Sequence, residues 1–317
     1  MSPILCVGFT YFDEKEMLTQ AISSLARQGT SDLEILVYDD ASSYPAQDHL
    51  PKGIPVRVIR GERNLGPSRG RNILLHESSA KYIHFHDADD LFLPNWQAEV
   101  RRILNLRQPD AVFTEILSTR NGILQSNQVM GLHKLAEHGD LTRFCIEGVM
   151  LTIAGTYRRA FVLDLGGYDE SVHQCEDFDF HIRLSLAAPQ YELLTRPLVE
   201  LRLRLDSRST RRIEVFRDGL RVLERAAQIL APFYRSYVGD ALLQFSRNLY
   251  QMGDIQGARA GFVLAKRLGP PSYRGQPDHY RWAAQLLGLE RAERVAAFYR
   301  MVVARITKRG LAVEKYR

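Results

Sequence analysis

Strand-like and helix-like segments alternate about five times in the first ~120 residues of this 317-residue chain. The strand-like runs, such as "PILCVGFTYF" and "LEILVYDDAS", are short and apolar on both faces, whereas "KEMLTQAISSLARQ" repeats its apolar residues at a helical period. This alternation predicts a mostly parallel sheet with helices on its faces. Further strands are predicted at "IPVRVIRGE", "KYIHFHDADD" and "DAVFTEIL", and further helices at "GPSRGRNILLHESSA" and "NWQAEVRRILNLRQ".

The pattern changes near residue 205, where the arginine-rich run "RPLVELRLRLDSRSTRR" precedes segments that are helical almost without strands. We therefore predict two domains, an α/β domain at 1–205 and a basic α-helical domain at 206–317. The second carries 21 Lys and Arg against 10 Asp and Glu, while the first is acidic. A basic helical region can face an anionic membrane surface or glycan, or it can simply be solvated.

Three widely spaced cysteines, Cys6, Cys145 and Cys175, form neither a disulfide framework nor a zinc motif, which suits a reducing compartment. The N-terminus lacks the basic and apolar regions of a signal peptide, and no window reaches the ~18 apolar residues of a membrane span. We expect a cytoplasmic protein, at most peripheral on the inner face of the membrane.

Aspartates gather where the predicted strands end. Asp87, Asp89 and Asp90 follow the apolar run "YIHFH", and other polar clusters follow the first two strands. Ligands of open α/β sheets bind outside the carboxyl ends of the strands, so these clusters are expected to share one crevice. Because strand side chains alternate, Asp87 and Asp89 can face the same space. Mg²⁺ prefers such oxygen ligands together with substrate phosphates, although solvated turn residues would leave the same pattern.

Five motifs in order, "FTYF", "YDDAS", "NLGPSRGRN", "HDADDLFLP" and "GGYDESVHQCEDFDFHIRL", resemble those of the family 2 glycosyltransferases with the GT-A fold. The resemblance covers about residues 3–205. It implies a Rossmann-like sheet that binds a nucleotide-sugar and an enzyme that transfers the sugar with inversion.

The resemblance also implies roles at the donor site. Thr10 and Tyr11 would lie against the nucleoside at the end of the first strand, and Asp40 would accept hydrogen bonds from the base. Arg71 of "NLGPSRGRN" would lie near the nucleotide, or it is a surface residue at a helix start. Gly70 stands where the family usually has alanine.

By the same resemblance, Asp89 would be the principal ligand of a Mn²⁺ or Mg²⁺ ion and Asp87 would contact the ribose or the metal. Asp90 is expected to cap the following helix. Where the family often has a histidine before a Ser-rich loop, this chain has Arg204, which would bind the diphosphate because guanidinium matches phosphate oxygens.

Glu176 and Asp177 open an apolar-periodic helix, where carboxylates are favoured in any case. An acceptor hydroxyl needs a base, and a carboxylate within hydrogen-bond reach can take its proton. The resemblance implies that Asp177 is this base and that Glu176 contacts the acceptor. The turn at Gly166 and Gly167 would line the acceptor side.

We therefore predict a metal-dependent, inverting, non-processive glycosyltransferase of polysaccharide biosynthesis. Its donor would be a nucleoside-diphosphate sugar and its acceptor a hydroxyl of a glycan, lipid-linked or protein acceptor. The C-terminal helices would serve acceptor binding, membrane contact or homo-oligomer formation, and nucleic acid is not an expected partner. A sugar nucleotidyltransferase is one alternative, although "FTYFDEKE" stands where its Gly-rich loop would be. A degenerate transferase that acts as a binding or scaffold module is another.

Overall fold

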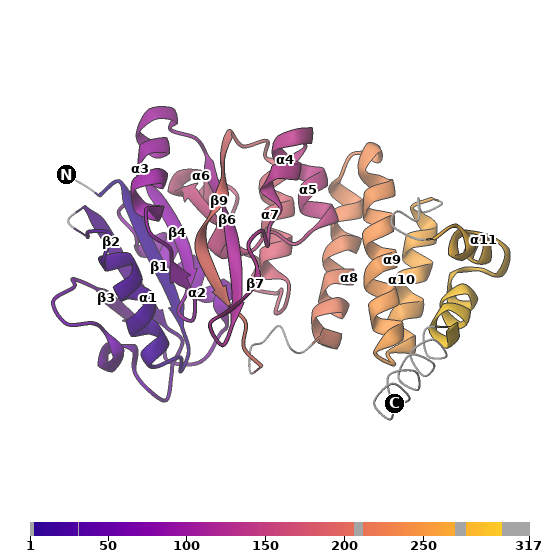
Figure 1. The fold of residues 1–317 in the computed structure, drawn as a ribbon, viewed down its shortest axis with the longest axis horizontal. Coiled ribbons are helices and arrows are strands. Elements are labelled where there is room, and N and C mark those ends of the chain that lie inside the picture. Colours follow the sequence, from indigo (N-terminus) through magenta and orange to yellow (C-terminus); the bar gives the residue numbers. More distant parts are fainter. Residues whose placement is uncertain (1–2, 31, 206–211, 270–276, 300–317) are drawn as a thin grey trace, which may run out of the picture. The chain divides into compact units, whose positions relative to one another are not determined.

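The computed structural model describes residues 3–30, 32–205, 212–269 and 277–299. The chain divides into two compact units, Met1–Thr210 and Arg211–Arg317 (Figure 1).

The first unit is built on a nine-stranded sheet with the order β3-β2-β1-β4-β8-β6-β9-β5, and β7 pairs with β6 outside this path. The three strands β2, β1 and β4 are parallel neighbours, and β3 continues them in parallel. The register sets Tyr11 beside Asp39 and Thr10 beside Asp87, so three strand ends meet at one edge. The strands are β1 (Leu5–Tyr11), β2 (Leu33–Asp39), β3 (Arg57–Arg60), β4 (Tyr82–Asp87), β5 (Leu91–Phe92), β6 (Ala111–Arg120), β7 (Ile123–Ser126), β8 (Gly155–Arg158) and β9 (Tyr191–Arg202).

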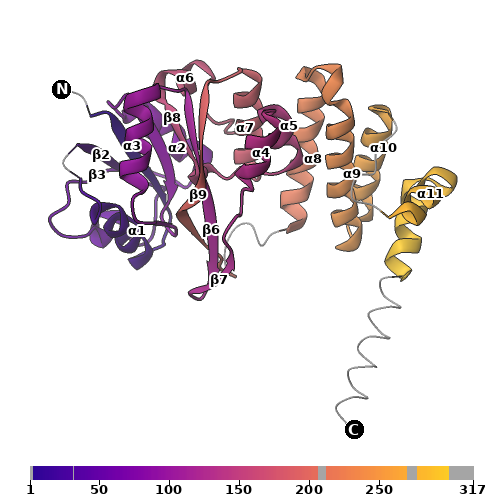
Figure 2. The same cartoon turned by 45° about the horizontal axis from the view of Figure 1, so that its top comes forward.

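The α/β architecture expected from the alternating segments is confirmed, but the sheet is mixed. The sequence pattern placed "DAVFTEIL" as a fifth strand of a mostly parallel sheet, whereas the antiparallel strand β8 lies between β4 and β6. The late strand β9 pairs in parallel with β6 and antiparallel with β5. Figures 1 and 2 show β6 and β7 as a long hairpin at the lower side of the sheet.

Helices cover both faces of this sheet. The neighbouring residues Gly8 and Phe9 of β1 face opposite sides of the sheet. Gly8 faces Leu74 of α2, and Phe9 packs edge-on against His86 and Phe92. The second face is completed by α3, whose Trp96 is fully buried against Phe92. The helices of this unit are α1 (Glu16–Ala26), α2 (Pro67–Glu77), α3 (Trp96–Arg107), α4 (Leu132–His138), α5 (Leu141–Glu147), α6 (Arg159–Asp164) and α7 (Glu176–Leu186).

Aromatic side chains fill the space between the sheet and α7. Phe85 of β4 meets Tyr168 edge-on, and Tyr168 stacks on Phe180 of α7 with ring centroids 4.3 Å apart. Because side chains of a strand alternate, Asp87 lies on the same face of β4 as Phe85. The packing of α7 against this face therefore brings its first turn toward the end of β4.

The second unit is helical, with α8 (Arg212–Ile229), α9 (Arg235–Gln251), α10 (Ile255–Arg267) and α11 (Asp278–Leu287), and residues 289–299 are helical as well. The helices α9 and α10 pack closely at Gly261, where a Cβ atom would lie 2.0 Å from Ser246 Oγ. A buried ion pair joins Arg247 to Glu293 at 2.9 Å. Among the residues that the structure describes, no helix is both long and apolar enough to cross a membrane.

Candidate active site

The aspartates after β4 have three different surroundings. Asp87 accepts a hydrogen bond from Thr10 Oγ1 at 3.2 Å and forms an ion pair with Arg71 at 2.9 Å. The carboxylate of Asp89 pairs with Arg204 at 3.0 Å. Asp87 and Asp89 remain partly exposed, with side chains 38% and 20% accessible. They are the two carboxylates of this strand end that a ligand can reach.

Asp90 is a structural residue, and the expectation that it caps a helix is wrong. Its side chain is buried and accepts a hydrogen bond from the backbone N–H of Arg202 at 2.8 Å. The next helix, α3, begins at Trp96 and is preceded by Asn95. Asp90 therefore fastens the turn after β4 to the end of β9, which brings Arg202 and Arg204 close to Asp89.

Two arginines from the end of β9 surround Asp89. Arg202 donates from Nε to the carbonyl oxygen of Asp89, and Arg204 donates from Nη1 to the sulfur of Met17 at 3.0 Å while it pairs with the Asp89 carboxylate. Burial and the charge of Asp87 raise the pKa of Asp89, while the Arg204 guanidinium opposes that rise. Ionisation of Asp89 is therefore disfavoured by its surroundings, and a further cation beside it would favour the ionised form.

Glu14 belongs to this acidic cluster, although sequence reasoning did not single it out. Burial, with a further contribution from the charge of Asp89, raises the pKa of Glu14 to about 7, and Arg204 acts in the opposite direction. The loop after β1 holds Glu14 between Asp13 and Lys15, which both have positive φ angles of 63° and 48°. Such backbone conformations are unfavourable for residues with a Cβ atom and are concentrated at functional sites. In the sequence, the polar cluster after the first strand was the signal that could have pointed to Glu14.

The donor set fits a divalent ion that is shared with a substrate. Among the described residues, no group of three or more His, Cys, Asp or Glu side chains is arranged to hold a metal by itself. Asp87 and Asp89 instead supply two carboxylates at one edge, and Mg²⁺ is commonly bound by one or two carboxylates together with phosphate oxygens. The residues therefore fit a Mg²⁺ or Mn²⁺ ion that would need further ligands, such as the oxygens of a diphosphate.

The ends of β1 and β2 are held by a network of hydrogen bonds. Asp39, which is buried, accepts from the backbone amides of Ser42 and Ala46 and pairs with Arg60 at 2.6 Å. Tyr11 is also buried, and its hydroxyl donates to the carbonyl of Tyr44 at 2.7 Å. The side chains of Asp39 and Tyr11 therefore support the loop after β2. Thr10, in contrast, is the residue of β1 whose side chain lies beside Asp87.

Asp40 binds the loop that leads into α2. Its two carboxylate oxygens accept the backbone N–H groups of Leu65 and Gly66, each at 2.8 Å. The side chain is 6% exposed. These two charge-assisted hydrogen bonds fix the position of the loop before α2.

Arg71 of α2 joins the end of β4 to the start of α7. Its guanidinium pairs with Asp87 at 2.9 Å and with Glu176 at 3.0 Å, and it lies 5.2 Å from the centre of the Tyr168 ring. Arg71 is 4% exposed, so it is a buried connector rather than a surface residue. Tyr168 lies in the "GGYDE" motif, but its position under the arginine could not be seen from the sequence.

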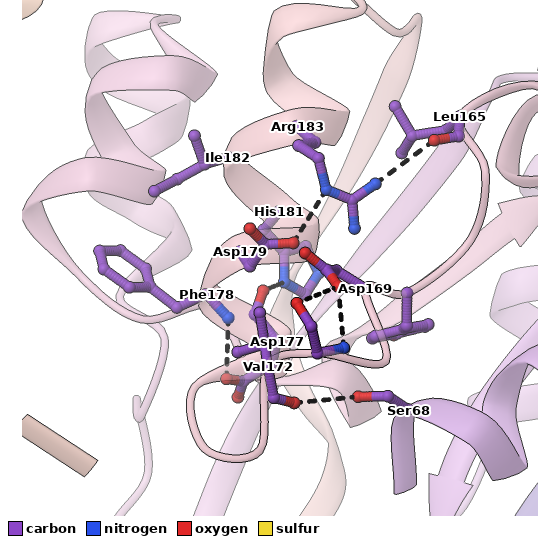
Figure 3. Close-up of polar contacts among 12 residues, drawn as sticks. Ser68, Leu165, Asp169, Val172, Asp177, Phe178, Asp179, His181, Ile182 and Arg183 are labelled. Carbon is purple, nitrogen blue, oxygen red and sulfur yellow. Dashed lines mark hydrogen bonds and ion pairs between the residues drawn. The ribbon is translucent and has the colours of Figure 1, made fainter. Parts of the chain in front are cut away.

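Asp177 lies in the first turn of α7 (Figure 3). It accepts the backbone N–H of Phe178 at 2.8 Å, and its own carbonyl oxygen is 2.7 Å from Nδ1 of His181. Burial and the adjacent charge of Glu176 raise the pKa of Asp177 to about 7, although Arg71 opposes the rise. The side chain of Asp179 points away from the Asp177 carboxyl group and pairs with Arg183 at 2.9 Å.

A separate cavity of about 480 Å³ lies on the outer side of α2, between it and the segment from Leu163 to Glu170. Gly166 and Gly167, which were expected to line the acceptor side, line this cavity. It contains none of the carboxylates described above.

Comparison with known proteins agrees with this geometry. The structure resembles S. aureus TarS 1-349 in complex with UDP-GlcNAc, with a TM-score of 0.68 and 16% identity over 95% of this chain and 92% of that one. It also resembles a mannosyltransferase from Pyrobaculum calidifontis in complex with GDP-Man and Mn²⁺, with a TM-score of 0.58 and 14% identity over 94% and 88% of the two chains. Both similarities support the expected GT-A architecture.

Sequence comparison finds an uncharacterized glycosyltransferase of Haemophilus influenzae that is 25% identical over 178 residues. The match spans 55% of this chain and 59% of that relative's length. The model of glycosyl transferase family 2 matches residues 6–166, which are half of the chain and include both strand ends that carry Asp40 and Asp87. The motifs, the fold and this match together show that the chain belongs to glycosyl transferase family 2.

Proposed function

We propose that this glycosyltransferase uses a divalent metal ion to transfer a sugar, with inversion, from a nucleoside-diphosphate sugar to a hydroxyl of a glycan or lipid-linked acceptor. One observation carries the proposal. Arg71 bridges Asp87 at the end of β4 and Glu176 at the start of α7, which supports a single site for the proposed metal-binding Asp87 and the proposed base that follows Glu176, Asp177. A donor held at the strand ends would then lie between the metal and the base.

On the donor side, Thr10 and Asp40 would contact the nucleoside, with Tyr11 supporting the loop around it. Asp89, helped by Asp87, would hold Mn²⁺ or Mg²⁺, whose role is to stabilise charge on the departing diphosphate. The solved neighbours hold different nucleotides, UDP-GlcNAc and GDP-Man, so the base and the sugar are left to experiment.

Arg204 would bind the diphosphate directly. It now pairs with Asp89, and guanidinium groups bind phosphate oxygens in the same way that they bind carboxylates. A diphosphate that enters beside Asp89 would offer Arg204 a second anionic partner. The arginine would then add positive charge on the leaving-group side without acting as a metal ligand.

On the acceptor side, Asp177 would take the proton of the attacking hydroxyl. A pKa of about 7 means that the carboxyl is about half ionised at neutral pH and is a stronger base than an ordinary aspartate. General bases are most effective when their pKa lies near the working pH. Attack from the side of Asp177, opposite the diphosphate, would invert the anomeric centre.

The test begins with a screen of nucleotide-sugars by thermal shift, with and without Mn²⁺, because a ligand of the folded state raises its melting temperature. With the donor found, Asp177→Asn should keep the thermal shift but lose release of the nucleoside diphosphate, measured with water as acceptor. Asp89→Asn should lose the Mn²⁺-dependent part of the shift. Asp179→Asn, two residues further along α7, is the matched control and should keep turnover. Turnover retained by Asp177→Asn would remove this residue from the mechanism.

We also propose that the second unit contacts the membrane surface that carries a lipid-linked acceptor. Its last helices expose Trp282, Phe298 and Tyr299, each more than 60% accessible. Tryptophan and tyrosine are enriched at membrane–water interfaces. The region from residue 206 onward is also basic, which favours anionic lipids.

A further inference from the structure

Arg71 has an unusual position for a residue expected to touch a nucleotide. It is 4% exposed, and both of its terminal nitrogens are engaged, one by Asp87 at 2.9 Å and the other by Glu176 at 3.0 Å. The ring of Tyr168 covers the guanidinium. Removing one partner of a buried ion pair is strongly destabilising, because the remaining charge is buried without compensation. Arg71 is therefore built to hold two carboxylates.

The surroundings of Asp177 show what this bridge can control. The largest effects of neighbouring charges on its carboxyl group come from Glu176 and Asp87, which disfavour ionisation, and from Arg71, which favours it. The neighbouring Tyr157, Tyr168 and His181 do not supply charge, because burial raises the pKa of both tyrosines and lowers the pKa of His181 to about 4. Arg71 thus pairs with both of the carboxylates, Asp87 and Glu176, whose charges act against ionisation of Asp177.

We infer that Arg71 is a positioning residue: its two ion pairs hold the first turn of α7 against the end of β4, and its charge offsets the charges of Asp87 and Glu176 near the proposed base, Asp177. The inference rests on the proposed function, because it assigns Arg71 to the base of that reaction. It also explains why an arginine, and not a lysine, stands here, since a planar guanidinium can hold two carboxylates at once.

The first test is a direct titration that needs no substrate. The protein is labelled with carboxyl-¹³C aspartate, and the Asp177 signal is assigned as the one missing in Asp177→Asn. In Arg71→Met, the titration midpoint of Asp177 should rise by about one pH unit or more, because an opposite charge at close range is lost. In Glu176→Gln it should fall, because a like charge is lost. The double variant should lie between the two.

Arg69→Met is the matched control. Arg69 also lies on α2 and also pairs with a glutamate, Glu170, at 3.1 Å, but both side chains are exposed. Its loss should leave the Asp177 midpoint unchanged. If Arg71→Met does not fold, Glu176→Gln still decides the matter, because it removes a charge without leaving a buried cation unpaired, as Arg71 keeps Asp87.

An unchanged Asp177 midpoint in a folded Arg71→Met, or in Glu176→Gln, would overturn the inference. The pH dependence of turnover gives a second readout: the acidic limb should move to higher pH in Arg71→Met and to lower pH in Glu176→Gln. If Asp177→Asn retains turnover, the assignment of Asp177 as the base fails whatever the titration shows. If Asp177→Asn is inactive and the titration is unmoved by Arg71→Met, the inference about Arg71 alone fails.

Discussion

Replacing Asp177 with asparagine should make the protein more stable at neutral and alkaline pH. Burial and the charge of Glu176 raise the pKa of Asp177 from 3.8 to about 7, so the folded state holds a proton that the unfolded chain releases at lower pH. Between these two pH values the folded state binds more protons than the unfolded state, and its stability falls as the pH rises. Asparagine has no proton to lose and avoids this cost.

The size of the effect follows from the two pKa values. They differ by about 3 pH units, and each unit corresponds to about 1.36 kcal/mol, so the upper limit is about 4 kcal/mol. Asp177 is partly accessible, and solvent screening reduces the gain to about 2–4 kcal/mol. For a unit of this size that corresponds to a rise in melting temperature on the order of 5–10 °C. The gain should be small below pH 4, grow up to about pH 7 and then level off.

The assay is a set of thermal melts of wild type and Asp177→Asn at pH 5 and pH 8 in identical buffers. Asp179→Asn serves as the opposite control, because it removes an ion pair with Arg183 on the same helix and should lower the melting temperature. If Asp177→Asn melts lower than wild type at pH 8, or if its gain is the same at both pH values, the reasoning about this carboxyl group is refuted.

Three further changes have definite expected outcomes. Asp40→Asn keeps one of the two backbone hydrogen bonds of Asp40 and should lower the free energy of unfolding by about 2 kcal/mol in urea denaturation. Gly70→Ala should destabilise the protein by about 1–3 kcal/mol, because the added Cβ would lie 2.8 Å from the Tyr38 ring, and a higher melting temperature would contradict this. Anionic vesicles should shift the fluorescence of Trp282 to shorter wavelength, whereas Trp282→Phe, which keeps the buried Trp96, should show no shift; neutral vesicles are the control.

The sequence predicted the parallel part of the sheet well because each of its strands is a continuous apolar run. Leu5–Tyr11, Leu33–Asp39 and Tyr82–Asp87 all fall inside the predicted segments. The mixed half was not predicted, because β8 has four residues and its antiparallel pairing depends on partners far away in the sequence. Local patterns carry no information about such pairing.

That Asp87 and Glu176 lie in one site could be expected from the family resemblance but not from the residues themselves. What links them is the buried Arg71, which sequence reasoning placed near the nucleotide or at the surface. Burial decides between such roles, and a single sequence does not report it.

The space at Gly70 is a related case: the Tyr38 ring occupies the volume that an alanine side chain would need, which gives a physical reason for the departure from the usual family residue.

The position of β9 bears on how the nascent chain matures. The strand begins at Tyr191, yet it lies between β6 and β5, which are synthesised much earlier. Until it emerges from the ribosome, β6 has an open edge on that side, and an open edge can pair with other chains. The stretch that matches the family model ends at residue 166 and so lacks an interior strand, as well as the arginines that reach Asp89. We therefore expect the proposed donor site to be completed late in synthesis, and a piece cut at the boundary of the family match to aggregate rather than fold.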